Sequence, residues 1–243
     1  MAPAIVLLHG FTHTGASWDP VRAALPERYR AYTPDIRGHG AATGVRPVTL
    51  DAVVEDLAHA APGTFTLAGY SMGGRIAMHA AFALAPRVSR LVLIGASPGI
   101  ADPVQRAARQ QADQALAAEI EASTLEEFAQ RWAQTPVLRG LGPDVGAAAH
   151  ADRLRSTPAG LASALRGLGT GALPSLWEKL WAVSVPVTLV VGERDDKFRE
   201  IAASMAALLP HAEVVVVPGS GHAAHLEAPE RVAGTIAGMA DSS

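Results

Sequence analysis

The sequence predicts an α/β fold in which a mostly parallel β-sheet is flanked by helices. Short apolar runs rich in Val, Ile and Leu recur along the chain, and segments with helical spacing lie between them. This alternation is typical of a parallel sheet wrapped by helices, with strands buried on both faces. The expected strands are residues 4–8, 64–68, 91–94, 187–191 and 214–217, and the expected helices are residues 50–60, 72–84, 201–209 and 222–239.

The region from about residue 98 to residue 181 has a different character. It is rich in Ala, Arg and Gln, is interrupted by prolines, and contains no convincing strand. A second independent domain is one interpretation, but the sparse aromatic residues and broken helices favour a helical lid over the sheet. We therefore expect one domain over residues 1–243, with a core of residues 1–97 and 182–243 and a lid at about 98–181.

Composition excludes several classes of function. The 243 residues are 49% hydrophobic and carry a formal net charge of −3, so no general basic field for nucleic acid exists. No Lys/Arg-rich run or long apolar segment predicts a membrane partner, and no signal-peptide pattern is present, so we expect a soluble, cytoplasmic protein. The chain has no Cys, and its histidines show no paired ligand spacing, so we expect no metal and no cofactor. The oligomeric state is left open.

The segment Gly69-Tyr70-Ser71-Met72-Gly73 lies between an expected strand and an expected helix. A serine in such a tight strand-to-helix turn has its hydroxyl pushed clear of the backbone, and small flanking glycines permit the turn. The pattern alone has moderate specificity, and an ordinary serine in a Gly-rich turn is the alternative. Its context predicts a nucleophile elbow at Ser71.

A serine hydroxyl needs a histidine to take its proton and a carboxylate to orient that histidine. Asp195 follows the apolar run 187–191, and His222 follows the run 214–217. Both positions are loops at the C-terminal ends of expected strands, where such sheets place their sites. We predict a Ser71–Asp195–His222 triad. Three rival residues have other expected roles: Asp196 as a solvated loop residue, Asp35 as part of a structural turn, and His225 as a structural residue.

An oxyanion hole is expected from two backbone amides. The amide of Met72 directly follows the nucleophile, and Phe11 follows the first expected strand in the run His9-Gly10-Phe11. Gly10 allows the backbone to turn inward at this point. The predicted donors are therefore the amides of Phe11 and Met72.

With these residues the chain resembles the α/β-hydrolase superfamily and, more narrowly, the 2-succinyl-6-hydroxy-2,4-cyclohexadiene-1-carboxylate synthases of menaquinone biosynthesis. The resemblance covers almost the full length and implies an α/β-hydrolase fold with the lid inserted after the sixth strand of the fold. The motifs that carry it are Leu8-His9-Gly10-Phe11 with Trp18, Gly69 to Arg75, Ser97-Pro98-Gly99-Ile100 with Arg106 and Arg109, Trp132 to Val137, Leu154-Arg155-Ser156, Gly192-Glu193-Arg194-Asp195 with Lys197-Phe198, and Gly221 to Glu227.

The resemblance implies a carbon–oxygen lyase rather than a hydrolase. Such an enzyme eliminates pyruvate from an enolpyruvyl-cyclohexene-carboxylate precursor, and Ser71 would act as the base that removes a ring proton. A substrate with several carboxylates calls for guanidinium groups, which grip carboxylates bidentately. By the family match, the substrate-binding residues would be Arg75, Arg109 and Arg155, together with Tyr70 and Trp132, whereas Arg106 is expected at the surface.

Two departures from the family pattern leave room for a changed substrate. Arg37 stands where the family commonly carries proline, and residues 139–149 look rearranged. A serine hydrolase of a carboxylic ester or of a carbon–carbon bond is the alternative enzyme, because the triad serves both chemistries. A receptor that binds a small ligand without turnover is a third interpretation, disfavoured by the complete triad and the polar lid.

Overall fold

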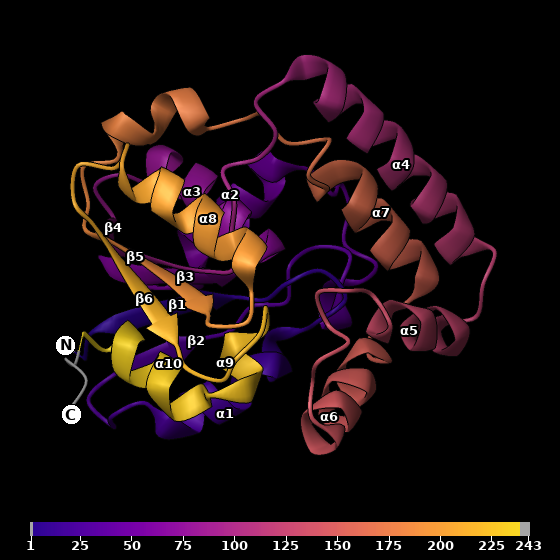
Figure 1. The fold of residues 1–243 in the computed structure, drawn as a ribbon, viewed down its shortest axis with the longest axis horizontal. Helices are drawn as coiled ribbons and strands as arrows, with labels where there is room; N and C mark the ends of the chain where they lie inside the picture. Colours follow the sequence, from indigo (N-terminus) through magenta and orange to yellow (C-terminus); the bar gives the residue numbers. More distant parts are fainter. Residues whose placement is uncertain (1, 239–243) are drawn as a thin grey trace.

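A computed structural model describes residues 2–238 of the chain. At its centre lies a six-stranded, entirely parallel sheet with the strand order β2-β1-β3-β4-β5-β6 (Figure 1). The strands are β1 (Ala4–Leu8), β2 (Arg30–Tyr32), β3 (Phe65–Tyr70), β4 (Val88–Ile94), β5 (Val187–Gly192) and β6 (Ala212–Val217). Because all strands run the same way, their C-terminal ends meet at one edge of the sheet, where the predicted site loops emerge.

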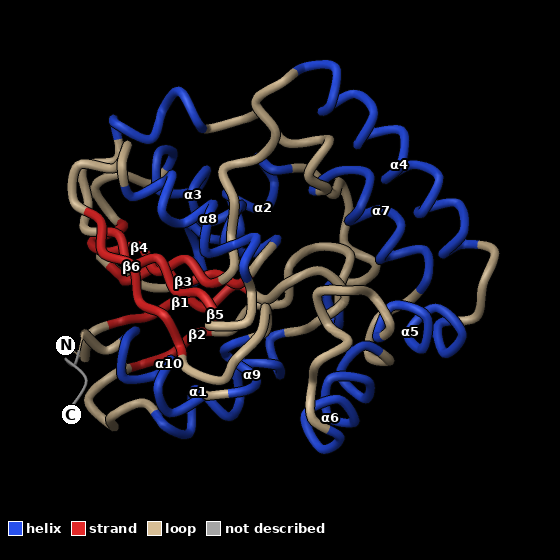
Figure 2. Tube along the Cα trace, in the orientation of Figure 1, coloured by secondary structure: helices blue, strands red, loops and turns tan. Residues whose placement is uncertain are grey.

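Helices cover both faces of the sheet, as Figures 1 and 2 show. One face carries α2 (Leu50–Ala60), α3 (Met72–Ala83) and α8 (Asp196–Ala206), and the other carries α1 (Asp19–Ala24), α9 (Ala224–Glu227) and α10 (Pro229–Ile236). Short 3-10 helices span η1 (Gly15–Trp18), η2 (Gly40–Ala42) and η3 (Trp177–Ala182). The expected α/β architecture with a parallel sheet is confirmed.

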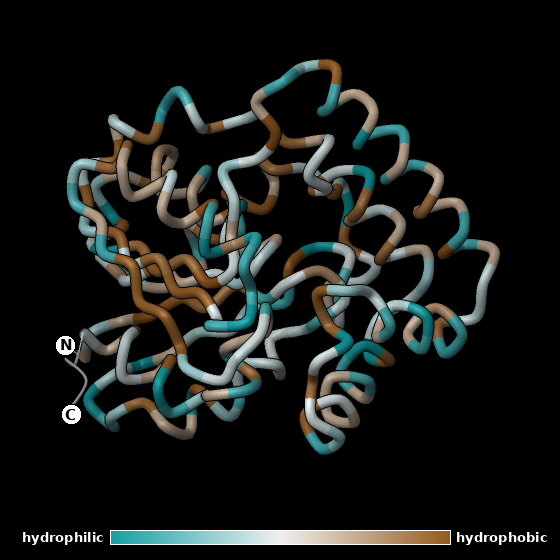
Figure 3. The backbone as a smooth tube through the Cα atoms, viewed as in Figure 1, coloured by the Kyte–Doolittle hydropathy of each residue, from teal (hydrophilic) through white to brown (hydrophobic). Residues whose placement is uncertain are grey.

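Alternate residues of each strand enter two different cores. In β1, Val6 and Leu8 pack on the side of α2, α3 and α8, whereas Ile5 and Leu7 pack on the side of α1 and α10. Because successive side chains of a strand point to opposite faces, a strand covered on both faces must be apolar throughout. The hydrophobic residues accordingly run along the strands in the middle of the molecule (Figure 3).

Some elements differ from the sequence-based expectation. The apolar run 214–217 was expected to be buried on both faces, but β6 is an edge strand, and Val214 and Val216 are 41% and 42% exposed. The expected helix over residues 222–239 is instead the pair α9 and α10, because the chain is interrupted just before Pro229, whose ring cannot continue a helix. Met239 lies outside the described residues. Helix α8 begins at Asp196, earlier than expected.

The segment between β4 and β5, residues 95–186, contains four long helices and no strand. These are α4 (Pro103–Glu121), α5 (Leu125–Ala133), α6 (Pro143–Arg153) and α7 (Pro158–Leu168), and with η3 we call them the insertion. It follows β4, the fourth strand of the described sheet. Helices α4 and α7 lie side by side at one end of the molecule and share a small core of their own (Figure 1).

Candidate active site

Ser71 lies in a sharp turn between β3 and α3. Its backbone has φ 51° and ψ −109°, a conformation that non-glycine residues rarely adopt and that stores strain. The turn is possible because Gly73 packs directly on β1: a Cβ atom on this residue would lie 2.3 Å from the carbonyl oxygen of Leu8. The result is a serine at the N-terminus of α3 whose side chain is free to face a cavity.

His222 and Asp195 meet Ser71 in the order that a proton relay requires. The Nε2 atom of His222 lies 3.3 Å from Oγ of Ser71, and its Nδ1 atom lies 2.6 Å from Oδ2 of Asp195. A carboxylate can only accept hydrogen bonds, so Nδ1 donates to Asp195 and Nε2 is left to accept the Ser71 proton. The side chains of His222 and Asp195 are only 5% and 8% exposed, which shields this pair from water.

The loops that carry Asp195 and His222 are bonded to each other by residues of the quoted motifs for which the sequence predicted no role. Glu227 accepts a hydrogen bond from the Gly221 amide at 2.9 Å and forms a salt bridge with Arg194 at 2.6 Å. Arg194 also donates its amide to the Ser220 carbonyl. Phe198 supports the histidine ring itself, with 4.4 Å between the two ring centroids. These contacts hold both loops in register.

Phe11 and Met72 lie beside Ser71 at the wall of the same cavity. Met72 is the first residue of α3, and the amides of a first helical turn have no acceptor within the helix. Among the described residues, the Phe11 amide makes no hydrogen bond. Two unpartnered amides next to a strained serine are what an oxyanion hole requires.

The cavity that contains Ser71 and His222 has a volume of about 350 Å³. Much of its lining is apolar and comes from the core and from the insertion: Phe11, Leu116, Trp132, Val137, Leu165, Trp177, Phe198 and Ile201. The polar groups are few, and they include two guanidinium groups, those of Arg75 and Arg109. Lys197, noted in the sequence beside Phe198, also lines the cavity. An anion with an apolar body suits this combination of an apolar lining and cationic groups.

Arg75 lies on α3, one turn beyond Ser71, and is 8% exposed. Its Nε atom is buried and has no partner among residues 2–238. Burial, helped by the nearby charge of Arg109, lowers the pKa of Arg75 to about 10. A buried nitrogen of a charged group that lacks a hydrogen-bond acceptor is unfavourable, by ~2 kcal/mol or more. Arg75 is therefore poised for an anionic ligand.

Arg109 reaches the cavity from α4 and is held by Asp113 on the same helix. The Nε atom of Arg109 donates to Oδ1 of Asp113 at 2.7 Å, and the other oxygen of this buried carboxylate accepts from the Gly171 amide at 3.2 Å. Asp113 was not identified from the sequence, although a spacing of four residues from an arginine is a recognisable pairing signal where the segment is helical. Asp113 therefore connects Arg109 to the part of the cavity lining that contains Gly169 and Thr170.

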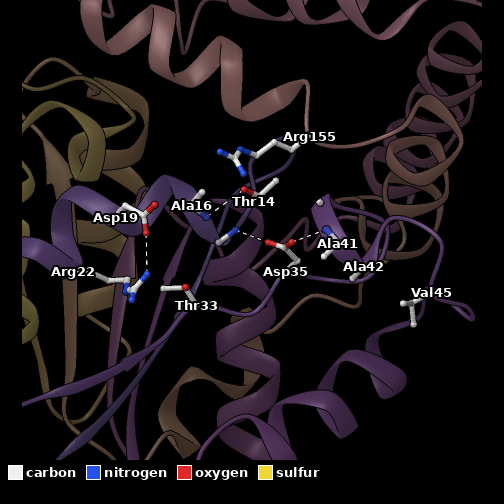
Figure 4. Close-up of a pocket in the computed structure, with 12 residues that line it drawn as sticks. Thr14, Ala16, Asp19, Arg22, Thr33, Asp35, Ala41, Ala42, Val45 and Arg155 are labelled. Carbon is white, nitrogen blue, oxygen red and sulfur yellow. Dashed lines mark hydrogen bonds and ion pairs between the residues drawn. The ribbon is translucent and has the colours of Figure 1, made fainter.

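The structure places Arg155 away from Ser71. Its side chain is 64% exposed and lines a separate surface cleft of about 730 Å³, together with Thr14 and Asp35 (Figure 4). None of Ser71, Asp195 and His222 borders this cleft. The physical reason is local: α6 ends at Arg153, its last turn buries Asp152 and Arg153, and the next two residues, Leu154 and Arg155, face solvent.

The two predicted aromatic contacts take different positions. Trp132 lines the cavity and packs edge-on against Phe11, with ring centroids 5.3 Å apart. Tyr70 is buried behind the elbow and does not border the cavity; its ring packs against His222 at 5.3 Å and His225 at 4.2 Å. In this arrangement Tyr70 supports the histidine rather than lining the substrate space.

The rival residues fall outside the relay. Asp196 is 87% exposed and pairs with Arg199. Asp35 accepts hydrogen bonds from the amides of Gly15 and Ala41, which closes a turn (Figure 4). His225 is fully buried against Trp18 and Tyr70, and burial lowers its pKa well below the usual value. Within the described residues, no group of three or more His, Asp or Glu side chains is arranged to hold a metal ion.

The fold and this constellation define a class of protein. The chain belongs to the alpha/beta hydrolase family, whose sequence model matches residues 5–235. Among curated relatives, the 2-succinyl-6-hydroxy-2,4-cyclohexadiene-1-carboxylate synthase of Enterobacter sp. (strain 638) is 34% identical over 239 residues, covering 97% of this chain and 90% of that protein. A Bacillus subtilis (strain 168) protein, provisionally named as the same synthase, is 37% identical over 236 residues, covering 93% and 86%.

The chain is also similar to solved structures. MenH from S. aureus matches with a TM-score of 0.91 and 30% identity, over 98% of this chain and 93% of that one. A thermophilic esterase from Thermogutta terrifontis, solved with malate bound, matches with a TM-score of 0.81 and 26% identity, over 96% and 88%. No helix in the part of the chain that the structure describes is both long and apolar enough to cross a membrane.

Proposed function

We propose that this protein is a carbon–oxygen lyase that eliminates pyruvate from an enolpyruvyl-cyclohexene-carboxylate precursor and releases 2-succinyl-6-hydroxy-2,4-cyclohexadiene-1-carboxylate. The names of the relatives at 34–37% identity over most of the chain support this assignment. The observation that carries it is the buried guanidinium of Arg75 in the cavity of Ser71, whose Nε has no hydrogen-bond partner within the described part of the chain, with Arg109 in the same cavity. An ordinary ester does not need two guanidinium groups at its binding cavity, whereas a substrate with several carboxylates does.

The geometry suggests how the elimination proceeds. The Ser71 oxygen, relieved of its proton by His222 Nε2, removes a proton from the ring of the substrate, and the electrons of that C–H bond form a new ring double bond. The bond from the ring carbon to the enolpyruvyl oxygen breaks, and the enolpyruvate that leaves takes up a proton to become pyruvate. Asp195 keeps His222 in the tautomer that accepts a proton at Nε2.

Charge that moves onto a substrate carboxylate or carbonyl oxygen during proton removal would be stabilised by the amides of Phe11 and Met72. Arg75 and Arg109 would bind the carboxylates, and Trp132 would cover the ring. We further propose that the chain forms one domain, with residues 1–97 and 182–243 as the core and the helices of about 98–181 as a lid. The insertion supplies Arg109 and Trp132, so the cavity is incomplete without it.

The test is product analysis with the purified protein. Incubation with the enolpyruvyl precursor should release pyruvate, measured by coupling to lactate dehydrogenase and NADH, and Ser71→Ala should abolish the release. Hydrolysis of 4-nitrophenyl acetate, measured in parallel, covers the alternative of a serine hydrolase, since the same triad can attack an ester. Rapid ester cleavage without pyruvate release would refute the lyase assignment. If Ser71→Ala keeps both activities, the assignment of this site is refuted.

A further inference from the structure

We propose that Asp152, on helix α6 of the insertion, is a positioning residue for the loop of residues 10–14, which presents the Phe11 amide to the cavity. Through this residue the insertion would help to shape the oxyanion hole. The proposal rests on the proposed function only in assuming that negative charge develops on an oxygen near Ser71. Asp152 does not border the cavity and so does not touch substrate.

The contacts of Asp152 converge on that loop. One carboxylate oxygen accepts from the Thr14 amide at 2.9 Å and from Nδ1 of His13 at 3.1 Å, and the other accepts from the Thr14 hydroxyl. The side chain of Asp152 is 9% exposed, and the partners Thr14 and His13 are buried as well. These groups are 138 and 139 positions apart in the chain, so only the folded insertion brings them together.

The loop needs such a restraint because its backbone is strained. Thr12, directly after Phe11, is fully buried and has φ 71°, a left-handed conformation that is unfavourable for a β-branched residue. Strained conformations of this kind cost about 1–3 kcal/mol and persist only when the surroundings hold them. One turn-closing bond, from the His13 amide to the Gly10 carbonyl, lies within the loop, and Asp152 supplies the restraint from outside.

The electrostatics of Asp152 agree with a firm restraint. Burial alone raises the pKa of this carboxyl group, but the combined hydrogen bonds from His13 and Thr14 outweigh burial and lower the pKa to about 2. The group is therefore a carboxylate at neutral pH, with its oxygens directed at three donors. The contact to Arg155 is longer, at 3.8 Å, and comes from a largely exposed side chain. The loop contacts are the stronger ones.

The same segment of the chain offers a matched control. Four residues beyond Asp152, the buried Ser156 accepts a hydrogen bond from the Gly40 amide at 3.0 Å. This bond also ties the insertion to the core, but to a different loop that contains no cavity residue. Removing Ser156 Oγ should weaken the attachment of the insertion while leaving the hydrogen bonds of Asp152 to His13 and Thr14 in place.

The experiment compares Asp152→Ala, Asp152→Asn, Thr14→Val and Ser156→Ala with the wild type. We expect kcat of Asp152→Ala to fall about 10- to 100-fold with KM within about twofold. The reason is that a displaced oxyanion donor reduces the stabilisation of the transition state and leaves substrate binding unchanged. Asp152→Asn keeps one acceptor oxygen and should recover part of kcat. Thr14→Val leaves the Thr14 amide in place, so its kcat should fall less than that of Asp152→Ala. Ser156→Ala should keep the wild-type kcat.

Activity is measured both as pyruvate release and as 4-nitrophenyl acetate hydrolysis, because an oxyanion hole serves both reactions. A wild type that hydrolyses the ester without releasing pyruvate would refute the lyase assignment and still test Asp152. A wild-type kcat in Asp152→Ala would overturn the positioning role, as would an equal loss in Ser156→Ala. Thermal melting monitors folding. If Asp152→Ala does not fold, the other two variants decide: a wild-type kcat in both Asp152→Asn and Thr14→Val would overturn the positioning role.

Discussion

Asp195 and His222 are 27 positions apart and follow two neighbouring strands, β5 and β6, yet Oδ2 of the first lies 2.6 Å from Nδ1 of the second. The pairing of β5 with β6 puts both loops at the same edge of the sheet, and Glu227 and Arg194 then bond the loops to each other. The carboxylate and the imidazole are thus oriented before any substrate is present. Such preorganisation is what a proton relay to Ser71 needs.

Asp195→Asn should keep the fold and lose most of the activity. The amide side chain has nearly the same shape, but it can present an NH₂ group to Nδ1 of His222 and so favour the wrong tautomer. We expect kcat to fall by about 10³- to 10⁴-fold, with the melting temperature little changed, and steady-state kinetics of pyruvate release measures it. Asp196→Asn is the control, because Asp196 is exposed and pairs with Arg199. A similar loss in both variants would contradict the assignment of the acid.

Arg75 and Arg155 give a sharp contrast between two predicted arginines. Arg75→Ala removes a buried cation from the cavity. It should lower kcat/KM roughly 10- to 150-fold, which corresponds to a loss of about 1.5–3 kcal/mol of transition-state stabilisation. Arg155→Ala changes a side chain on another cleft and should leave kcat/KM within about twofold. If instead Arg155→Ala were as damaging as Arg75→Ala, the insertion would have to rearrange when substrate binds.

Asp113→Asn tests how Arg109 is held. The substitution keeps the size of the side chain but removes the charge that faces Nε of Arg109. We expect a rise in KM of roughly tenfold with a smaller change in kcat, because a less restrained guanidinium binds a carboxylate less well in both ground and transition states. Glu119→Gln on the same helix, which removes a partly exposed ion pair with Arg131, should leave KM unchanged. Equal KM values in the Asp113 variant and the wild type would exclude this role.

Gly73→Ala should destabilise the protein through the elbow. The new Cβ atom would meet the Leu8 carbonyl oxygen at 2.3 Å, so β1 and α3 would have to separate. Overpacking of this kind destabilises by about 1–3 kcal/mol or more, and urea denaturation measures it. Gly146→Ala is the matched control: it lies inside α6 with nothing within 4 Å, and it should stabilise by about 0.5–1 kcal/mol. An undisturbed stability in Gly73→Ala would contradict the tight approach.

Stability should fall as the pH drops from about 6.5 to about 4. Burial, the largest cause, lowers the pKa of His9 to about 4 and that of His39 to about 3, from an ordinary value of 6.5. Between these values the unfolded chain binds more protons than the folded one, so the free energy of unfolding decreases as the pH falls, by up to about 1.4 kcal/mol per pH unit for each histidine. Urea denaturation at pH 7 and pH 5 measures the slope.

His39→Asn should reduce that slope, because one buried histidine no longer needs to stay neutral. A wild-type stability that is the same at pH 7 and pH 5 would contradict the buried, neutral state of His9 and His39.

Much of the fold and of the relay could be predicted from the sequence because the signals are local. The apolar strands at residues 4–8 and 187–191 matched β1 and β5 closely, since burial on both faces leaves a continuous apolar run. The serine turn, and the loops after β5 and β6, are marked by short glycine-containing motifs. Local patterns failed where position in the sheet matters: Val214 and Val216 look like core residues but lie on an edge strand.

The sequence by itself determined the fold class, the elbow at Ser71 and the chain order of Ser71, Asp195 and His222, because spacing and turn chemistry are properties of neighbouring residues. Only the tertiary structure decided which arginines face the cavity, and it separated Arg75 and Arg109 from Arg155. Only the tertiary structure brought Asp152 onto Thr14 and Asp113 beneath the Gly171 amide. The physical reason is that the direction of a side chain at the end of a helix depends on what the neighbouring turn buries, and the insertion acquires its partners only when it packs on the sheet.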